Sequence, residues 1–182
     1  ADLHQADLTD ANLGWANLKE ANLSGVNLDD AIFSNADLQD AILKGTDAKR
    51  ADFSYANLSG ADLSFSDFSR ANLTGVRLAG TNLKNVILIG TLLGKTDFDG
   101  ADLRNADFEE ADLRGAMFSG FDMSGANLMR SNLSDASLDR TKLVGANLVR
   151  AYLPRANLED SNLVDTDLSE AYLYEANLVG AD

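Results

Sequence analysis

The sequence repeats with a period of five residues along its whole length. From Ala1 onward, thirty-six consecutive units fit one frame without insertion or deletion, and only Ala181 and Asp182 are left over. The third residue of the unit is Leu, Phe or Met in 35 units, with Ala48 as the exception. The first residue is Ala in 23 units and otherwise Ser, Thr or Val, apart from Phe121. Such regularity requires every unit to adopt the same local structure.

The five-residue period excludes an α-helix and favours extended segments joined by corners. A helix turns about 100° per residue, so a five-residue step would spread the leucines around every side. In an extended segment the first and third residues share one face, and the second points the opposite way. Twelve of the 14 glycines occupy the fifth position, and the single proline, Pro154, occupies the fourth. The fourth and fifth residues therefore form the corner, where a permissive backbone is needed.

The repeated motif A(D/N)LXX, as in ADLTD at 6–10 and ANLED at 156–160, resembles the signature of the pentapeptide-repeat family. The resemblance covers the chain as one uninterrupted domain, residues 1–182, of 36 repeats. It implies an all-β fold, a right-handed quadrilateral β-helix (a pentapeptide-repeat solenoid), with about twenty residues per coil and about nine coils.

A twenty-residue coil predicts which side chains lie in one column of the interior. Ala48 falls between Leu28 and Phe68, so we expect the phenylalanine to compensate for the small residue in a densely packed core. The same register predicts that aromatic residues stack in two pairs, which are Phe33 with Phe53 and Phe98 with Phe118.

The chain is acidic, with 29 Asp and Glu against 15 Lys and Arg and a net charge of −14. This charge argues against direct nucleic-acid binding and against an anionic membrane surface, and it favours basic partners. In the four-sided coil that the resemblance implies, the acidity concentrates on two opposed faces. Each face consists of every fourth five-residue unit and is named here by its first unit. The face that begins with 6–10 has 11 acids and 5 bases, and the face that begins with 16–20 has 8 acids and 3 bases.

No targeting signal or membrane-spanning segment is recognisable in the sequence. No apolar run approaches the ~20 residues of a transmembrane helix, and this chain contains no signal peptide. We therefore expect a soluble protein, although its compartment is unknown. The absence of cysteine excludes disulfides, thiolate catalysis and zinc–thiolate sites.

We predict no catalytic, cofactor-binding or metal-binding residues, and hence no enzyme. The only histidine, His4, falls on an outward position, which does not suit a Ser–His–Asp arrangement. Vertically stacked acids, Asp47 with Asp67 and Asp102 with Asp122, could bind a cation. However, the glycine-rich nonapeptide of calcium-binding β-rolls is absent, so a solvated row of acids is the favoured interpretation. No phosphate-binding GxxxxGK[ST] motif occurs.

One face carries most of the outward aromatic residues and is the candidate interaction surface. It begins with residues 11–15 and holds Trp15 and Tyr55 at corners, with Tyr152, Tyr172 and Tyr174 facing outward. Aromatic side chains of this kind anchor protein interfaces. The alternative is that they cover neighbouring backbone on a solvated wall. Tyr152, Tyr172 and Tyr174 form the tighter group.

Two functions are compatible with these features. The first is a non-catalytic structural or protein-interaction scaffold, whose partner the sequence does not identify. The second, which the resemblance implies, is an acidic DNA mimic that binds a type II topoisomerase such as DNA gyrase, as the quinolone-resistance branch of the family does. Gyrase-protecting members have a C-terminal dimerisation segment, and several have projecting loops. This chain has no interruption in its register, so we favour the scaffold.

The ends of a solenoid expose unpaired strand edges unless caps cover them. The first unit, ADLHQ, and the last, ANLVG, look like interior units. We expect either caps outside this chain or end-to-end self-association.

Overall fold

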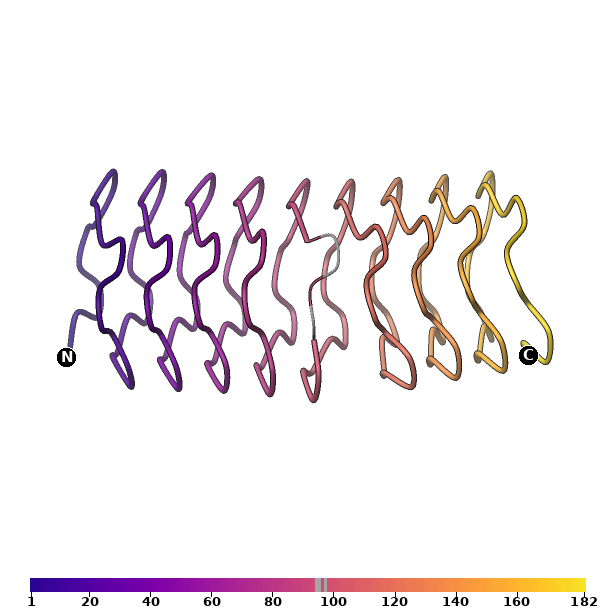
Figure 1. Ribbon diagram of the computed structural model, residues 1–182, viewed down its shortest axis with the longest axis horizontal. Coiled ribbons are helices and arrows are strands. Elements are labelled where there is room, and N and C mark those ends of the chain that lie inside the picture. Colours follow the sequence, from indigo (N-terminus) through magenta and orange to yellow (C-terminus); the bar gives the residue numbers. More distant parts are fainter. Residues whose placement is uncertain (94–95, 97) are drawn as a thin grey trace.

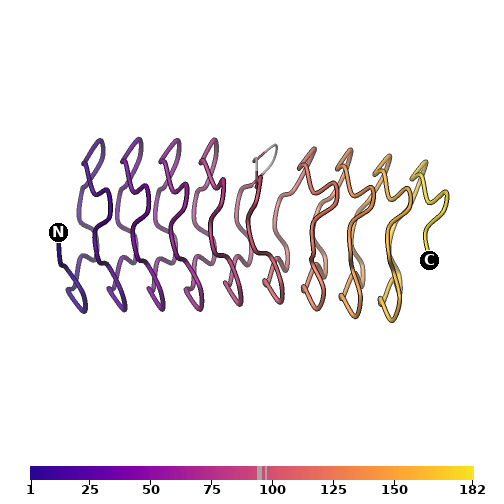
Figure 2. The ribbon, with the colours of Figure 1, turned by 90° about the horizontal axis from the view of Figure 1, so that it is seen from below.

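The chain winds into a rod-shaped solenoid with its termini at opposite ends (Figure 1). The computed structural model describes residues 1–93, 96 and 98–182. When the rod is turned by 90°, the coils still follow one another along the same axis (Figure 2). The described residues form no helix, and their β-structure consists of single bridged residues rather than longer strands.

Successive coils pair in parallel with a register of twenty residues. The bridges join second-position residues, from Asp2↔Asn22 at one end to Asn157↔Asn177 at the other. One coil therefore contains four five-residue units. The expected all-β solenoid, with its first and third residues inward, is confirmed, because these positions form the buried core.

The corner of each unit is a hydrogen-bonded turn over its fourth and fifth residues. The N–H of Ala6 donates to the C=O of Leu3 at 3.0 Å, and the same bond recurs in the following units. All described fifth residues have positive φ, 12 of them glycine and 23 not, for example Gly25 and Trp15 at 63°. The fifth residue of the unit is the third residue of this four-residue turn. A positive φ there favours glycine, which adopts this conformation without strain. The corner was therefore predicted correctly.

The preference for Asn and Asp at the second position has a local cause that the periodicity did not reveal. The side-chain oxygen accepts the N–H of the fourth residue, as Asn12 does from Gly14 at 3.0 Å and Asp52 from Ser54 at 2.9 Å. This bond stabilises the corner from within the unit. Amides also link neighbouring coils, as in the 3.1 Å bond from Asn72 Nδ2 to Asp52 Oδ1.

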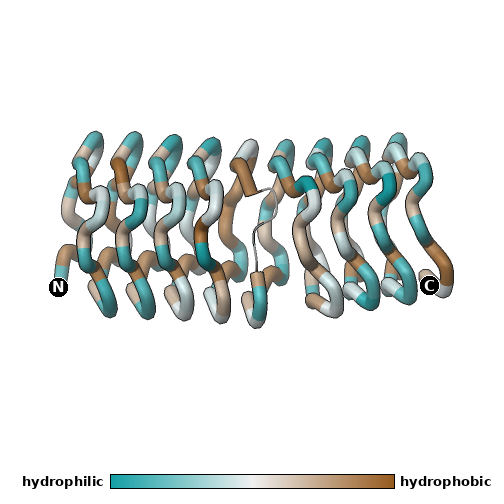
Figure 3. The backbone as a smooth tube through the Cα atoms, viewed as in Figure 1, coloured by the Kyte–Doolittle hydropathy of each residue, from teal (hydrophilic) through white to brown (hydrophobic). Residues whose placement is uncertain are grey.

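The interior is a continuous column of leucine and phenylalanine. Hydrophobic and hydrophilic residues alternate along each coil (Figure 3). Both predicted phenylalanine pairs are in contact. The rings of Phe33 and Phe53 stack at 4.7 Å and 3°, whereas those of Phe98 and Phe118 lie 5.0 Å apart and are tilted by 32°. Ala48 is fully buried, and Phe68 is tilted by 59° against Phe53 at 5.3 Å.

Candidate interaction surface

Three tyrosines form one aromatic group on consecutive coils, here called the tyrosine cluster (Tyr152, Tyr172 and Tyr174). Tyr152 and Tyr172 are bridged second-position residues, and their rings stack at 4.9 Å with an interplanar angle of 9°. The ring of Tyr174 lies 6.2 Å from that of Tyr172. All three side chains remain exposed, at 45%, 48% and 57%. The twenty-residue register accounts for the first pair, since it places outward side chains directly above one another.

The backbone beneath the tyrosine cluster is fixed by bonds between coils. Tyr172 N donates to the Ala151 carbonyl at 2.9 Å, and the Tyr174 carbonyl accepts the N–H of Arg155, also at 2.9 Å. Arg155 in turn donates two 2.7 Å bonds to the carboxylate of Asp135. These bonds hold the pKa of Asp135 below its ordinary value. The tyrosines therefore project from a rigid wall beside an ion pair that is already satisfied.

The other two candidate aromatics lie apart from the tyrosine cluster. Within the described residues, no ring contact joins Trp15 or Tyr55 to it. Trp15 is 79% exposed at a corner of the first coil. Tyr55 lies over the corner of the next coil, because a Cβ added to Gly75 would come 2.6 Å from its ring. Tyr55 thus covers backbone, which is the alternative role that the sequence left open.

The stacked acids hold cationic side chains of the protein itself. Lys49 Nζ lies 2.8 Å from a carboxylate oxygen of Asp47 and 3.3 Å from one of Asp67. Hydrogen bonding to Asp47 is the main cause of the raised pKa of Lys49. Asp102 is held by two bonds from Arg104, at 2.9 and 2.6 Å. Within the described part of the chain, no group of three or more His, Cys, Asp or Glu side chains is arranged to hold a metal ion.

Arginines interleave with the acids on the most acidic face. Arg50 reaches Asp29 at 2.6 Å and Asp30 at 2.8 Å, and Arg150 reaches Glu170 at 2.8 Å. The net negative charge of this face is therefore broken by local ion pairs. It does not form the continuous row of unpaired charge that duplex DNA presents.

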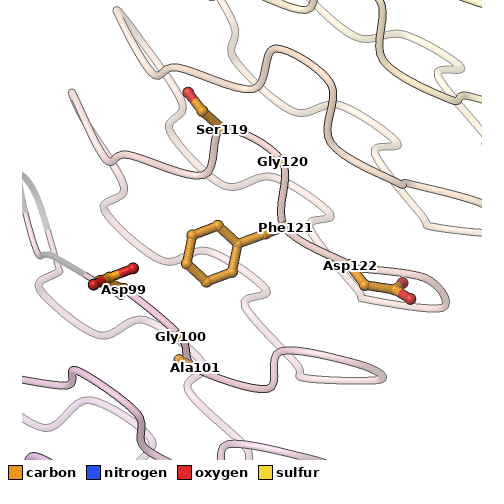
Figure 4. A pocket seen from close by; sticks show the side chains of 7 residues that line it. All are labelled: Asp99, Gly100, Ala101, Ser119, Gly120, Phe121 and Asp122. Atoms are coloured by element: carbon orange, nitrogen blue, oxygen red, sulfur yellow. The ribbon is translucent and has the colours of Figure 1, made fainter.

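A second surface feature, which the sequence did not lead us to expect, surrounds Phe121. Two adjoining pockets of about 360 and 350 Å³ share Asp99, Ser119 and Phe121 in their linings. Figure 4 shows the phenylalanine ring and the Asp99 side chain within the opening, whereas the Asp122 carboxylate points away from it. We call this feature the Phe121 opening and define it by the residues that line the first pocket, which are Asp99, Gly100, Ala101, Ser119, Gly120, Phe121 and Asp122.

The Phe121 opening coincides with a break in the pairing between two coils. From 2↔22 to 157↔177, every pair of described second-position residues twenty apart is bridged except Asp102 with Asp122. Ala101 is partly exposed, whereas the other first-position alanines between Ala21 and Ala156 are buried. Phe121 packs edge-on against Phe118, at 6.4 Å and 84°. A phenylalanine where the other units have a small residue therefore separates the coils locally. The sequence signal was present, since Phe121 is the sole exception at the first position.

Within residues 1–93, 96 and 98–182, no helix has the length and apolar character needed to cross a bilayer.

Comparison with known proteins gives consistent family matches. A model of pentapeptide repeats matches residues 1–35, 31–64 and 151–182, and a model of a pentapeptide repeat region matches 61–148. No curated protein sequence matches the chain.

Three solved structures illustrate the similarity. HetL of the cyanobacterium Nostoc sp. strain PCC 7120, a pentapeptide repeat protein involved in heterocyst differentiation regulation, is 33% identical. That match covers 99% of this chain and 88% of HetL, with a TM-score of 0.43. A pentapeptide repeat protein of the Arabidopsis thaliana thylakoid lumen is 34% identical over 54% of this chain and 68% of that one, with a TM-score of 0.52.

QnrB1, a plasmid-mediated fluoroquinolone resistance protein, is 19% identical over 100% of this chain and 77% of its own, with a TM-score of 0.55. At this identity the likeness shows the fold alone. The family models together match nearly the whole chain, and the chain therefore belongs to the pentapeptide-repeat family.

Proposed function

We propose that the protein is a non-catalytic scaffold that binds a protein partner through the tyrosine cluster. In this proposal residues 1–182 form a single domain of about nine right-handed coils. The observation that carries the proposal is the exposure of three tyrosines whose rings lie 4.9 and 6.2 Å apart on hydrogen-bonded coils.

The geometry of the tyrosine cluster suits a protein partner better than a stacked flat ligand. Because Tyr152 and Tyr172 cover each other's inner faces, the cluster offers ring edges, hydroxyls and outer faces to a partner. Tyrosine is enriched among the residues that contribute most to interface affinity. Mutual stacking on a fixed backbone also reduces the side-chain entropy that binding must remove, since the rings are already ordered.

The test compares partner capture by two matched variants. The triple variant Tyr152→Ser, Tyr172→Ser and Tyr174→Ser removes the cluster, and the control variant Trp15→Ser with Tyr55→Ser removes two exposed aromatics elsewhere. We expect the captured partner, once purified, to bind the control like the parent chain and to bind the triple variant at least tenfold more weakly. Thermal unfolding of both variants checks that the coils remain intact. If the partner binds the triple variant as tightly as it binds the parent chain, the proposal is wrong.

The DNA-mimic role is the second candidate, and the acidity of two opposed faces is the observation that favours it. The ion pairs of Arg50 and Arg150 weigh against it, since they interrupt the charge on the most acidic face. The deciding measurement is a DNA gyrase supercoiling titration with the purified chain, with and without a fluoroquinolone. Inhibition or drug protection at low micromolar protein would move the binding site to the acidic faces. No effect at a large molar excess would retire this candidate.

A further inference from the structure

Trp15 and Tyr55 lie in one column along a corner of the rod, two coils apart. Both are fifth-position residues whose backbone N–H groups bond to the next coil, at 3.0 Å for Trp15 and 2.9 Å for Tyr55. Asn35, between them, is bonded in the same way at 2.9 Å. This stretch of the corner is therefore regular, and the two aromatic residues are fixed about 9.6 Å apart along the rod axis, at about 4.8 Å per coil.

Each of the two rings is open to solvent. Trp15 is 79% exposed and Tyr55 is 63% exposed, and within the described residues neither contacts another ring. Tyr55 has the Gly75 corner beneath it, where the missing Cβ leaves room for the ring. The rings of the tyrosine cluster, by contrast, cover one another. The corner therefore presents two separate aromatic platforms rather than one apolar patch.

The wall between the two rings is polar but almost uncharged. Among the four units of this face from 11–15 to 71–75, the only charged side chain is that of Asp52. Its carboxylate already accepts the N–H of Ser54 at 2.9 Å and the side-chain amide of Asn72 at 3.1 Å. In a chain of net charge −14, this wall offers no row of charge to a polyanion or to a strongly basic partner. It suits a neutral ligand.

Polar groups beside the rings are free to bond such a ligand. The side chains of Ser34, Asn35 and Ser54 are partly exposed, and none has a hydrogen-bond partner in the described part of the chain. The Ser34 N–H is unpaired there as well, because Ile32 stands at the second position, where Asn or Asp caps most corners. Hydroxyl and amide groups both donate and accept, so they match a ligand that also does both.

We propose that this corner, here called the Trp15–Tyr55 corner (Trp15, Asn35 and Tyr55 with Ser34 and Ser54), binds a neutral, extended glycan of the β-1,4-linked glucan type. The flat faces of a β-glucose ring carry C–H groups that pack on an aromatic face, and its hydroxyls, which donate and accept, lie at the ring edge.

The spacing of the two platforms matches this ligand. Two sugars of an extended β-1,4-linked chain span nearly the same length as two coils, about 9.6 Å. Alternate sugars can therefore stack on Trp15 and Tyr55 while the sugar between them faces Asn35. The Trp15–Tyr55 corner is separate from the tyrosine cluster, and the proposal does not depend on that surface.

The test is a titration with cello-oligosaccharides, followed by fluorescence because Trp15 is the only tryptophan of the chain. Cellobiose can cover one ring, whereas cellohexaose can cover both, so we expect cellohexaose to change the Trp15 emission saturably and to bind at least tenfold more tightly. Maltohexaose, the α-1,4-linked isomer with a curved chain, should bind at least tenfold more weakly than cellohexaose. Equal binding of the two hexasaccharides, or no saturation by cellohexaose up to millimolar concentrations, would overturn the proposal.

Two variants test whether the rings act together. Tyr55→Ala should weaken cellohexaose binding at least tenfold while leaving cellobiose binding at Trp15 within twofold, which also shows that the corner remains folded. Phe65→Ala is the matched control, because it removes an exposed aromatic side chain from another face and should leave both affinities unchanged. If Tyr55→Ala binds cellohexaose as tightly as the parent chain does, the two-ring site is refuted.

Discussion

Replacing Phe121 with alanine should stabilise the protein, although it removes a large apolar side chain. Alanine is the residue that most units carry at this position. With alanine at position 121, the two coils on either side of the Phe121 opening can approach to the regular spacing of about 4.8 Å between parallel strands. Three backbone bonds across the opening, with Gly100, Leu103 and Asp122 as donors, are absent within the described residues, and they then form as they do one coil later.

The expected magnitude is the balance between the hydrogen bonds that form and the ring packing that is lost. Three restored hydrogen bonds contribute about 0.5–1.5 kcal/mol each, or about 3 kcal/mol together at the middle of that range. The edge-on interaction between Phe121 and Phe118 is lost, at about 0.5–1.5 kcal/mol. Because Phe121 is only partly buried, its remaining apolar burial costs about 1 kcal/mol. The expected net change is a stabilisation of about 1 kcal/mol.

The assay combines urea unfolding with native-state hydrogen exchange. The unfolding midpoint should rise in Phe121→Ala, and the amides of Gly100, Leu103 and Asp122 should gain protection from exchange. Phe118→Ala is the contrasting control, since that side chain is fully buried and its removal costs about 3–5 kcal/mol. A lower midpoint for Phe121→Ala with unchanged exchange at the three amides would refute the argument that this ring holds the coils apart.

Three further predictions concern the core, the corners and the charges. Phe53→Ala should destabilise by about 3–5 kcal/mol in urea unfolding, because its fully buried ring contacts two other phenylalanines. Gly75→Ala should lower the melting temperature more than Gly80→Ala. Both sites have positive φ, at 67° and 68°, but only the Cβ at Gly75 would strike a neighbouring ring; equal losses would contradict this. The pKa of Asp112 is held below its ordinary value of 3.8 by hydrogen bonding to Arg114, so the stability present above that value should be lost as the pH falls through the lowered pKa. Arg114→Gln should flatten this dependence in melts between pH 6 and pH 2.

Most of the fold could be predicted from the repeat, because the period determines both the side-chain direction and the corner. The inward first and third residues, the corner at the fifth residue and the stacking of Phe33 on Phe53 all follow from it. The role of second-position Asn and Asp was missed. Periodicity reports which way a side chain points but not which nearby N–H it bonds, as Asn12 does to Gly14.

The candidate surfaces were predictable only in part. The register places Tyr152 directly above Tyr172, but it does not specify that Tyr174 turns toward them or that Tyr55 lies down over Gly75. These orientations depend on whether the neighbouring corner leaves room for a ring. A glycine at the next corner provides that room for Tyr55, whereas a larger residue would block it.

The Phe121 opening illustrates how a repeat fold can acquire an irregular surface without an insertion. In the regular units, the second and third residues of each coil pair through backbone bonds with the neighbouring coils, so the middle of each wall offers a partner mainly side chains. One oversized residue at an inward position interrupts that pairing over a few bonds and leaves backbone N–H and C=O groups unpaired beside an aromatic ring within the described residues. The adjoining coils hold the gap in place, because pairing resumes at Asn105 on the same coil. The repeat therefore maintains the rod, and its single exception at the first position creates the feature most unlike the rest of the surface.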